Sequence, residues 1–196
     1  MTDISTLINN PFAAILLAVL WGICEKVADL LNEHGLKLFY GADLLFGILW
    51  GLFLALLVIN EDIVISNLAF AMLLSYILRY RIDYINHGIA AMIVIFAFLL
   101  NGAIIDWNIL VFFFTIFSIG GIIHDSLERE KVKSLLGSYL TTFFEYRGHI
   151  YVFPLIFSIC TGVWTAFLVA SAHMLSYEVV RQYYKKVERQ RINSSI

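Results

Sequence analysis

Long apolar runs, each interrupted after a short distance, constrain this chain more than any other feature. The interruptions are of two kinds, and the two alternate along the sequence. One kind combines Arg or Lys with His and carboxylates, at residues 25–37, 79–87 and 124–149. The other contains only Asn, Asp and Glu as strongly polar residues, at residues 60–62 and 101–108. Because Lys and Arg gather in the cytoplasmic loops of membrane proteins, we expect the first kind at the cytoplasmic face.

The composition explains where so many apolar residues can go. Hydrophobic residues make up 61% of the 196 residues and charged residues 14%, with a mean hydropathy of +0.84. Soluble domains are closer to half apolar and a quarter charged, and one core of this size could not bury the excess. The sequence therefore predicts a single integral membrane domain over residues 1–196, in the cell membrane as a multi-pass protein, with a short basic cytoplasmic tail at 181–196.

The apolar runs predict an all-α fold, a polytopic transmembrane helix bundle of about seven membrane segments. A spanning helix needs about 20 mostly apolar residues. Gly47 and Gly51 have the GxxxG spacing that lets two helices approach closely, and packing within the chain is the favoured use of this motif. The expected helices cover residues 11–31, 38–59, 65–78, 88–100, 107–123 and 151–177, with 135–144 as a shorter apolar piece.

The positive charges also determine the expected topology, with the N-terminus outside and the C-terminus inside. Five crossings bring the chain to the cytoplasm at residues 124–133. The tail, which carries five of the thirteen basic residues between 181 and 191, is expected there too. Two further crossings are then needed, so residues 135–144 are predicted to form a short sixth span. If residues 135–144 form a re-entrant segment, or if the first helix does not cross the membrane, the alternative is six membrane segments.

The first helix and the start of the second supply three candidate carboxylates. Glu25 and Asp29 are four residues apart and therefore share a helix face, an arrangement that suits a divalent cation. The alternative is an amphipathic helix end that faces lipid head groups. Asp43 is an isolated acid in an apolar helix, which needs either a partner or a proton. We interpret Asp43 as a candidate catalytic residue, with a structural role as the alternative.

The third break offers a candidate phosphate site. Arg79 and Arg81 could grip a phosphate with paired hydrogen bonds. Asp83 and His87 are four residues apart, so Asp83 could orient a catalytic His87, or both could hold a metal. The alternative is a cytoplasmic turn in which the aspartate pairs with an arginine.

The fifth predicted helix closes with a further cluster of candidate residues. His124 and Glu128 share a face, with Asp125 beside them. We interpret His124 as catalytic and Asp125 and Glu128 as metal ligands, because His and carboxylates together suit Zn or Mn. An ordinary charged helix end is the alternative. His149 and His173 stay outside this set.

These residues come from several helices, yet they fall at one predicted depth. Carboxylates, a divalent metal ion (Zn, Mn or Mg) and arginines are the groups used in phosphoryl chemistry. The hypothesis is a membrane-embedded, metal-dependent hydrolase or transferase of lipid metabolism, acting on a lipid or polyprenyl phosphate head group at the cytoplasmic face. The alternatives are a small transporter or channel, and a non-catalytic assembly subunit. The expected partners are the bilayer, a lipid substrate, and a second copy or another membrane protein, with no nucleic acid.

Overall fold

The computed structural model describes residues 9–128 and 137–194, and within them the side chains of residues 9–127 and 137–190. This part of the chain is all-α, with eight helices and no strand. The helices are α2 (Pro11–Glu33), α3 (Ala42–Val58), α4 (Ile63–Leu78), α5 (Ile85–Asn101), α6 (Trp107–Glu128), α7 (Ser138–Glu145), α8 (His149–Thr161) and α9 (Thr165–Ser194).

Local sequence signals explain several of the helix boundaries. Asn10 caps α2 by accepting a 2.9 Å hydrogen bond from the Phe12 amide, and Pro11 follows at the first helical position. Asp62 caps α4 in the same way, and Asp106 accepts hydrogen bonds from two amides in the first turn of α6. Gly102 has a positive φ of 60° at the end of α5, a conformation that glycine adopts without strain.

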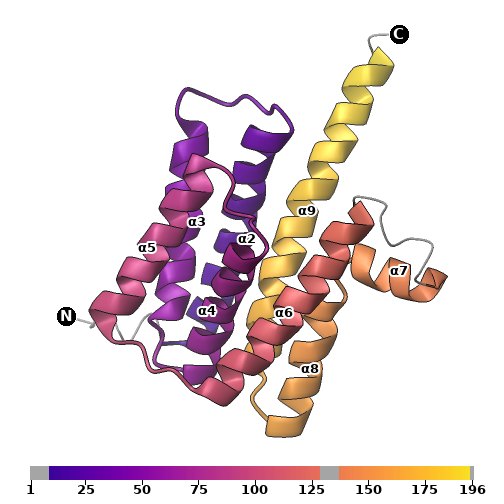
Figure 1. Cartoon of the computed structure of the whole chain (residues 1–196). Helices are drawn as coiled ribbons and strands as arrows, with labels where there is room; N and C mark the ends of the chain where they lie inside the picture. The colour runs from indigo at the N-terminus through magenta and orange to yellow at the C-terminus, as the bar shows by residue number, and fades with distance from the viewer. Residues whose placement is uncertain (1–8, 129–136, 195–196) are drawn as a thin grey trace.

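From α2 to α6 the helices run up and down, so that consecutive breaks lie at opposite ends of the bundle, and α8 and α9 form a further antiparallel pair (Figure 1). The main packed pairs are α2 with α9, α3 with α5, α2 with α3, and α4 with α6. Gly47 and Gly51 make the α3–α5 contact possible, because an added Cβ would lie 2.6 Å from atoms of Asn86 and Ala90. The GxxxG motif is thus used for packing within the chain, as expected.

The end of the bundle with the acidic and Asn-rich breaks is held by hydrogen bonds between separate segments. The Asn67 amide nitrogen donates to the Ile104 carbonyl at 3.0 Å, and its oxygen accepts from the Asp106 amide. The Thr165 hydroxyl donates to Asp62 at 3.1 Å, which ties the start of α9 to the start of α4. We call this end, formed by residues 9–10, 59–62, 102–106 and 162–165, the acidic end.

The C-terminal third differs from the sequence-based expectation. Residues 151–177 do not form one helix, because Gly162, with a φ of 77°, ends α8 and the chain reverses into α9 (Figure 1). Within 135–144, residues 138–144 make up all but the last residue of α7, whose eight residues rise only about 12 Å and bury no side chain. The expected short span at 135–144 is therefore not formed by α7.

Length and composition mark one described helix as a candidate membrane span. This is α6, over Trp107–Leu127, with 21 residues. The helices α3, α4, α5 and α8 are apolar but have 17 residues or fewer. One such helix is in keeping with association with a membrane, whereas the expected seven do not all pass the same test.

Candidate functional site

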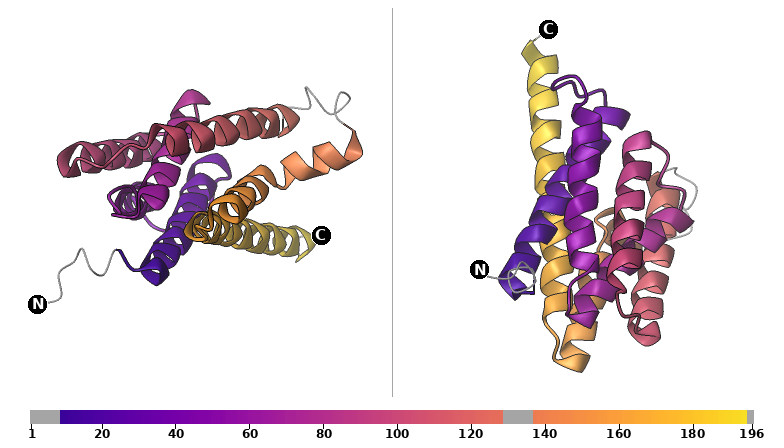
Figure 2. Two further views of the ribbon diagram at one scale, coloured as in Figure 1. Left: turned by 90° about the horizontal axis from the view of Figure 1, so that it is seen from below. Right: turned by 90° about the vertical axis from the view of Figure 1, so that its left-hand side faces the viewer.

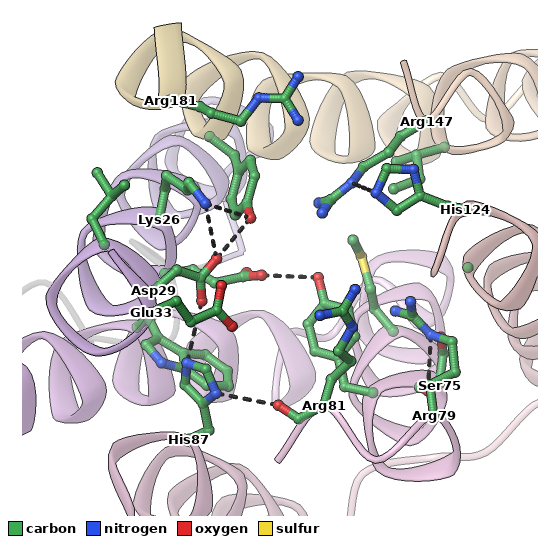
Figure 3. Close-up of a pocket in the computed structure, with 18 of the residues that line it drawn as sticks. Lys26, Asp29, Glu33, Ser75, Arg79, Arg81, His87, His124, Arg147 and Arg181 are labelled. Atoms are coloured by element: carbon green, nitrogen blue, oxygen red, sulfur yellow. Dashed lines mark hydrogen bonds and ion pairs between the residues drawn. The ribbon is translucent and has the colours of Figure 1, made fainter. Parts of the chain in front are cut away.

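A cavity of about 430 Å³ lies among the helices, toward the end opposite the acidic end, and Figure 3 shows side chains that line it. Residues of α2, α3, α4, α5, α6, α8 and α9 line it, together with the turns after α2, α4 and α7. The cationic side chains around it are Lys26, Arg79, Arg81, Arg147, Arg181 and Lys185, and the carboxylates are Glu25, Asp29, Glu33 and Glu188. His34, His87, His124 and His149 also line it. The breaks that mix cations, His and carboxylates thus converge on one site.

Asp29 is at the centre of the first group of contacts. Its carboxylate accepts a 2.7 Å hydrogen bond from the Tyr177 hydroxyl on α9 and lies 3.4 Å from the Lys26 ammonium. Lys26 also donates to the Tyr177 hydroxyl at 3.2 Å. The other Asp29 oxygen lies 3.3 Å from Nε2 of His87. These contacts join α2, α5 and α9 around one carboxylate.

His87 faces an acceptor with each ring nitrogen. Nδ1 lies 3.2 Å from the Arg81 carbonyl and 3.5 Å from Asp83, and Nε2 faces Asp29. Two acceptors on opposite sides of the ring are both satisfied only by the imidazolium form, which has two donors. The i,i+4 spacing does bring Asp83 beside Nδ1 of His87, although half of the Asp83 side chain is exposed.

Glu25 is the second buried carboxylate of α2. One oxygen accepts a 3.0 Å hydrogen bond from the Tyr76 hydroxyl, and the other lies 2.9 Å from Nε2 of His173. His173 is fully buried, and Trp21 stacks on its ring with centroids 3.7 Å apart. This pair links α2, α4 and α9 on the inner side of the cavity.

Two arginines after α4 share one carboxylate on α6. Arg79 donates to Asp125 at 3.1 Å and to the Ser75 carbonyl at 3.3 Å, and Arg81 contacts the other Asp125 oxygen. Gly121 makes room for Arg79, since a Cβ on Gly121 would lie 2.4 Å from the guanidinium carbon.

Arg147 approaches the cavity from the turn between α7 and α8. Its Nε donates to Nε2 of His124 at 3.2 Å, and its guanidinium lies 4.8 Å from the centre of the Tyr177 ring. Nδ1 of His124 faces the Phe144 carbonyl at 2.9 Å, so His124 is a neutral imidazole that donates from Nδ1 and accepts at Nε2. Burial alone would lower the pKa of Arg147, but Tyr177, Tyr76 and Glu25 raise it above its usual range. Figure 3 shows the Arg147 guanidinium pointing into the cavity.

The sequence-predicted residues divide between the cavity and its surroundings. Most of them line it: Glu25, Asp29, Arg79, Arg81, His87 and His124. Asp125 lies directly behind Arg79 and Arg81. Asp43 is exposed on a shallow outer surface of α3, away from the cavity, and Asp83 contacts the cavity only through His87. The Glu128 side chain is outside the described part of the chain.

Two of the predicted metal ligands each lie beside a histidine. Asp29 pairs with His87, and Glu25 pairs with His173. Among the described residues, no group of three or more His, Cys, Asp or Glu side chains is placed to hold a metal ion. Each pair could supply two ligands, and a substrate phosphate or water would have to supply the others.

Sequence reasoning missed several residues of the site. Lys26 and Tyr177 complete the Asp29 group, Arg147 contacts His124, and His173 holds Glu25. Arg147 and His149 do lie in a mixed polar break of the kind that marked the other site residues. Gly148 between them disfavours a regular helical spacing of these residues, so the sequence did not place them in the predicted site. For Tyr177 no sequence signal exists, because an apolar helix contains many tyrosines that contact nothing polar.

Comparisons with known proteins give no family assignment. No protein-family model, no curated protein and no solved structure matches this chain.

Proposed function

We propose that this protein is an integral membrane helix bundle whose cavity faces the cytoplasm. Many large apolar side chains are exposed along the outer faces of the helices, far more than the isolated ones normal for a soluble surface. Lipid is the environment that covers such a surface without cost. Examples from four helices are Phe12, Leu16, Leu52, Phe96, Leu99, Val111 and Ile119.

Seven of the eight described helices would cross the bilayer, and α7 would lie at its surface. The break at Gly162 supplies the crossing that 135–144 was expected to supply, because α8 and α9 are two antiparallel helices. The proposed topology keeps the N-terminus outside and places both the cation-rich cavity and the basic tail in the cytoplasm. The 13 residues of α8 rise about 20 Å, and local thinning of the bilayer accommodates a helix of that length.

Cysteine labelling tests this topology. Cys24 and Cys160 are replaced by Ala, and a single Cys is then placed at Glu61 or at Lys186. A membrane-impermeant maleimide added to intact cells is expected to label position 61 only. Labelling of position 186 from outside would overturn the proposed orientation.

For the chemistry, we propose an enzyme that binds the phosphate of a lipid or polyprenyl head group in this cavity and acts on it. The observation that carries the proposal is Arg147, a guanidinium aimed into the cavity whose described contacts are a neutral imidazole and an aromatic ring. Among the residues that the structure describes, no carboxylate forms an ion pair with Arg147, and a guanidinium that is partly buried without such a contact favours binding of an anion. Lys26, Arg79 and Arg181 surround the same space and strengthen this preference.

The two carboxylate–His pairs are the candidate proton-handling groups of the proposed enzyme. In each pair the carboxylate fixes the orientation of the imidazole, as general acid–base catalysis requires. A divalent ion that enters with the phosphate could be held by one of these pairs, so Zn, Mn and Mg belong in the assays.

The experiment measures binding and turnover with the full-length protein in nanodiscs. Phosphatidic acid and farnesyl phosphate serve as probes, with phosphatidylcholine as the neutral reference, and phosphate release is followed with EDTA or with each divalent ion. The wild type is expected to bind both probes, and Arg147→Ala to lose about tenfold in affinity, the loss of one charge-assisted contact. Arg189→Ala, an exposed tail residue outside the cavity, is the matched control and should bind normally. Equal binding of all three lipids by the wild type would refute the binding proposal, and binding without phosphate release or transfer would refute the enzyme.

A further inference from the structure

Two turns that carry arginines of the cavity have an unusual backbone. Among the described non-glycine residues, only Tyr80 and Arg147 have a positive φ, at 55° and 53°. Tyr80 lies between Arg79 and Arg81, and Arg147 is itself the arginine that points into the cavity. Backbone strain of this kind persists only where surrounding contacts hold it, and it gathers at functional sites.

Asp125 holds the first of these turns. The left-handed residue Tyr80 turns the chain so that the arginines on both sides of it reach the same carboxylate. The side chain of Arg79 is fixed at a second point by the Ser75 carbonyl. Asp125 is mostly buried and lies on α6, so the orientation of both arginines depends on a neighbouring helix.

His124, the residue before Asp125, holds the second turn. Its Nδ1 donates to the Phe144 carbonyl at the end of α7, which fixes the backbone just before Arg147. Its Nε2 accepts from Nε of Arg147, which fixes the side chain. Because Nε is occupied in this way, the outer edge of the guanidinium, with its two terminal nitrogens, is the part that remains for a ligand.

We propose that His124 and Asp125 are positioning residues that hold Arg79, Arg81 and Arg147 in place before a phosphoryl group binds. This inference rests on the proposed function, and it replaces the expected catalytic role of His124 and ligand role of Asp125 with an indirect one. Neither residue contacts the substrate. Both lower the cost of binding, because the arginines need not be ordered when the phosphate arrives.

Two substitutions of His124 separate its two hydrogen bonds. The amide nitrogen of His124→Asn can take the place of Nδ1 and still donate to Phe144, but the shorter side chain cannot accept from Arg147. The longer side chain of His124→Gln places an oxygen near Nε2 and keeps the bond to Arg147. With phosphatidic acid in nanodiscs, we expect His124→Asn to bind about tenfold more weakly and His124→Gln to stay within about threefold of the wild type.

A double-mutant cycle separates positioning from general damage to the fold. In an Arg147→Ala background, His124→Asn is expected to cause no further loss of affinity, because the group that it positions is gone. If His124→Asn does not fold, the same cycle is measured with Asp125→Asn and Arg79→Ala. A wild type that does not bind phosphatidic acid refutes the proposed function itself. The positioning role alone is refuted if the wild type binds phosphatidic acid but the substitutions of His124 and Asp125 still weaken binding in full after the arginines are removed.

Discussion

Replacement of Gly121 by Ala tests the arrangement of Arg79 with the smallest possible change. A Cβ at this position would lie 2.4 Å from Cζ, 2.5 Å from Nη1 and 2.6 Å from Nε of Arg79. A Cβ atom does not approach a non-bonded heavy atom to less than 3 Å, so one of the two partners must move. Gly121 lies in the middle of α6, whose backbone is fixed by its own hydrogen bonds, whereas Arg79 ends in a flexible side chain. We therefore expect Arg79 to be displaced and α6 to stay in place.

The expected loss of stability follows from the contacts that Arg79 would give up. Its hydrogen bond to Asp125 is 3.1 Å long and mostly buried, with 10% of the Arg79 side chain and 14% of the Asp125 side chain exposed. A hydrogen bond to a charged group contributes about 1.5–3 kcal/mol. Replacement of Gly by Ala inside a helix returns about 0.5–1 kcal/mol. Gly121→Ala should therefore lower the free energy of unfolding by about 0.5–2.5 kcal/mol.

Gly88→Ala is the matched control, because it also replaces a helical glycine. There the nearest atom to an added Cβ is Cγ2 of Ile82, at an ordinary 3.9 Å. This substitution should stabilise the protein by about 0.5–1 kcal/mol, which is the gain from replacing Gly by Ala inside a helix with no new close contact. The two Gly→Ala substitutions are thus expected to shift the thermal unfolding midpoint in opposite directions in the same detergent.

The decisive comparison places Gly121→Ala in an Arg79→Ala background. Without the guanidinium, the added methyl group no longer meets it, so the substitution should become stabilising by about 0.5–1 kcal/mol. The measurement is the midpoint of reversible unfolding, followed by tryptophan fluorescence. If Gly121→Ala remains destabilising by the same amount in that background, its effect does not act through Arg79, and the close packing described for α6 and Arg79 is incorrect.

Two further predictions concern strain and buried polar pairs. Tyr80→Gly should raise the thermal midpoint and add up to about 1 kcal/mol, because relief of the left-handed conformation of an exposed Tyr outweighs the flexibility of Gly. Tyr40→Gly, at an equally exposed tyrosine without a positive φ, should instead lower the midpoint, and equal shifts for both would contradict the strain argument. Glu25→Ala should cost about 2–5 kcal/mol, since it leaves the Tyr76 hydroxyl and the buried His173 without an acceptor. Glu25→Gln, which keeps one acceptor oxygen, should lose about half as much in a urea titration, and a loss as large as that of Glu25→Ala would argue against the hydrogen-bond account.

The sequence allowed most helices to be predicted, because apolar runs end at capping residues and glycines that act locally. The helices predicted at 11–31, 65–78 and 107–123 illustrate this, since α2, α4 and α6 begin directly after the capping residues Asn10, Asp62 and Asp106. The reversal at Gly162 escaped prediction because no charged residue lies near it, and the polar residues beside it, Thr161 and Thr165, also occur inside apolar helices. No polar break marked the end of α8, so residues 151–177 read as one long helix.

The site was predictable only in part, for a different physical reason. The spacing of Glu25 and Asp29 places both on one face, and the structure confirms that this face turns toward the cavity. Asp43 has the same chemical character, yet it lies on the outer side of α3, because the rotation of a helix about its axis depends on packing against its neighbours. Arg147 depends on even more distant contacts, since it reaches the cavity only through a turn held by His124.

The hydrogen bonds at the acidic end have a consequence for motion. Asn67 joins α4 to the segment before α6, and Asp62 joins α4 to α9, so the helices are fastened together at that end. The longer described connection, at residues 34–41 between α2 and α3, lies at the end with the cavity (Figures 1 and 2). Helices tied at one end can spread only at the other, in the manner of a hinge.

A bundle of this kind would admit and release its ligand through the same opening. Transporters that work by alternating access need gates that open in turn on both sides of the membrane. The fastened acidic end instead suits the proposed enzyme, which would take a head group from one leaflet and return its product to the same leaflet, while the lipid chains never change sides.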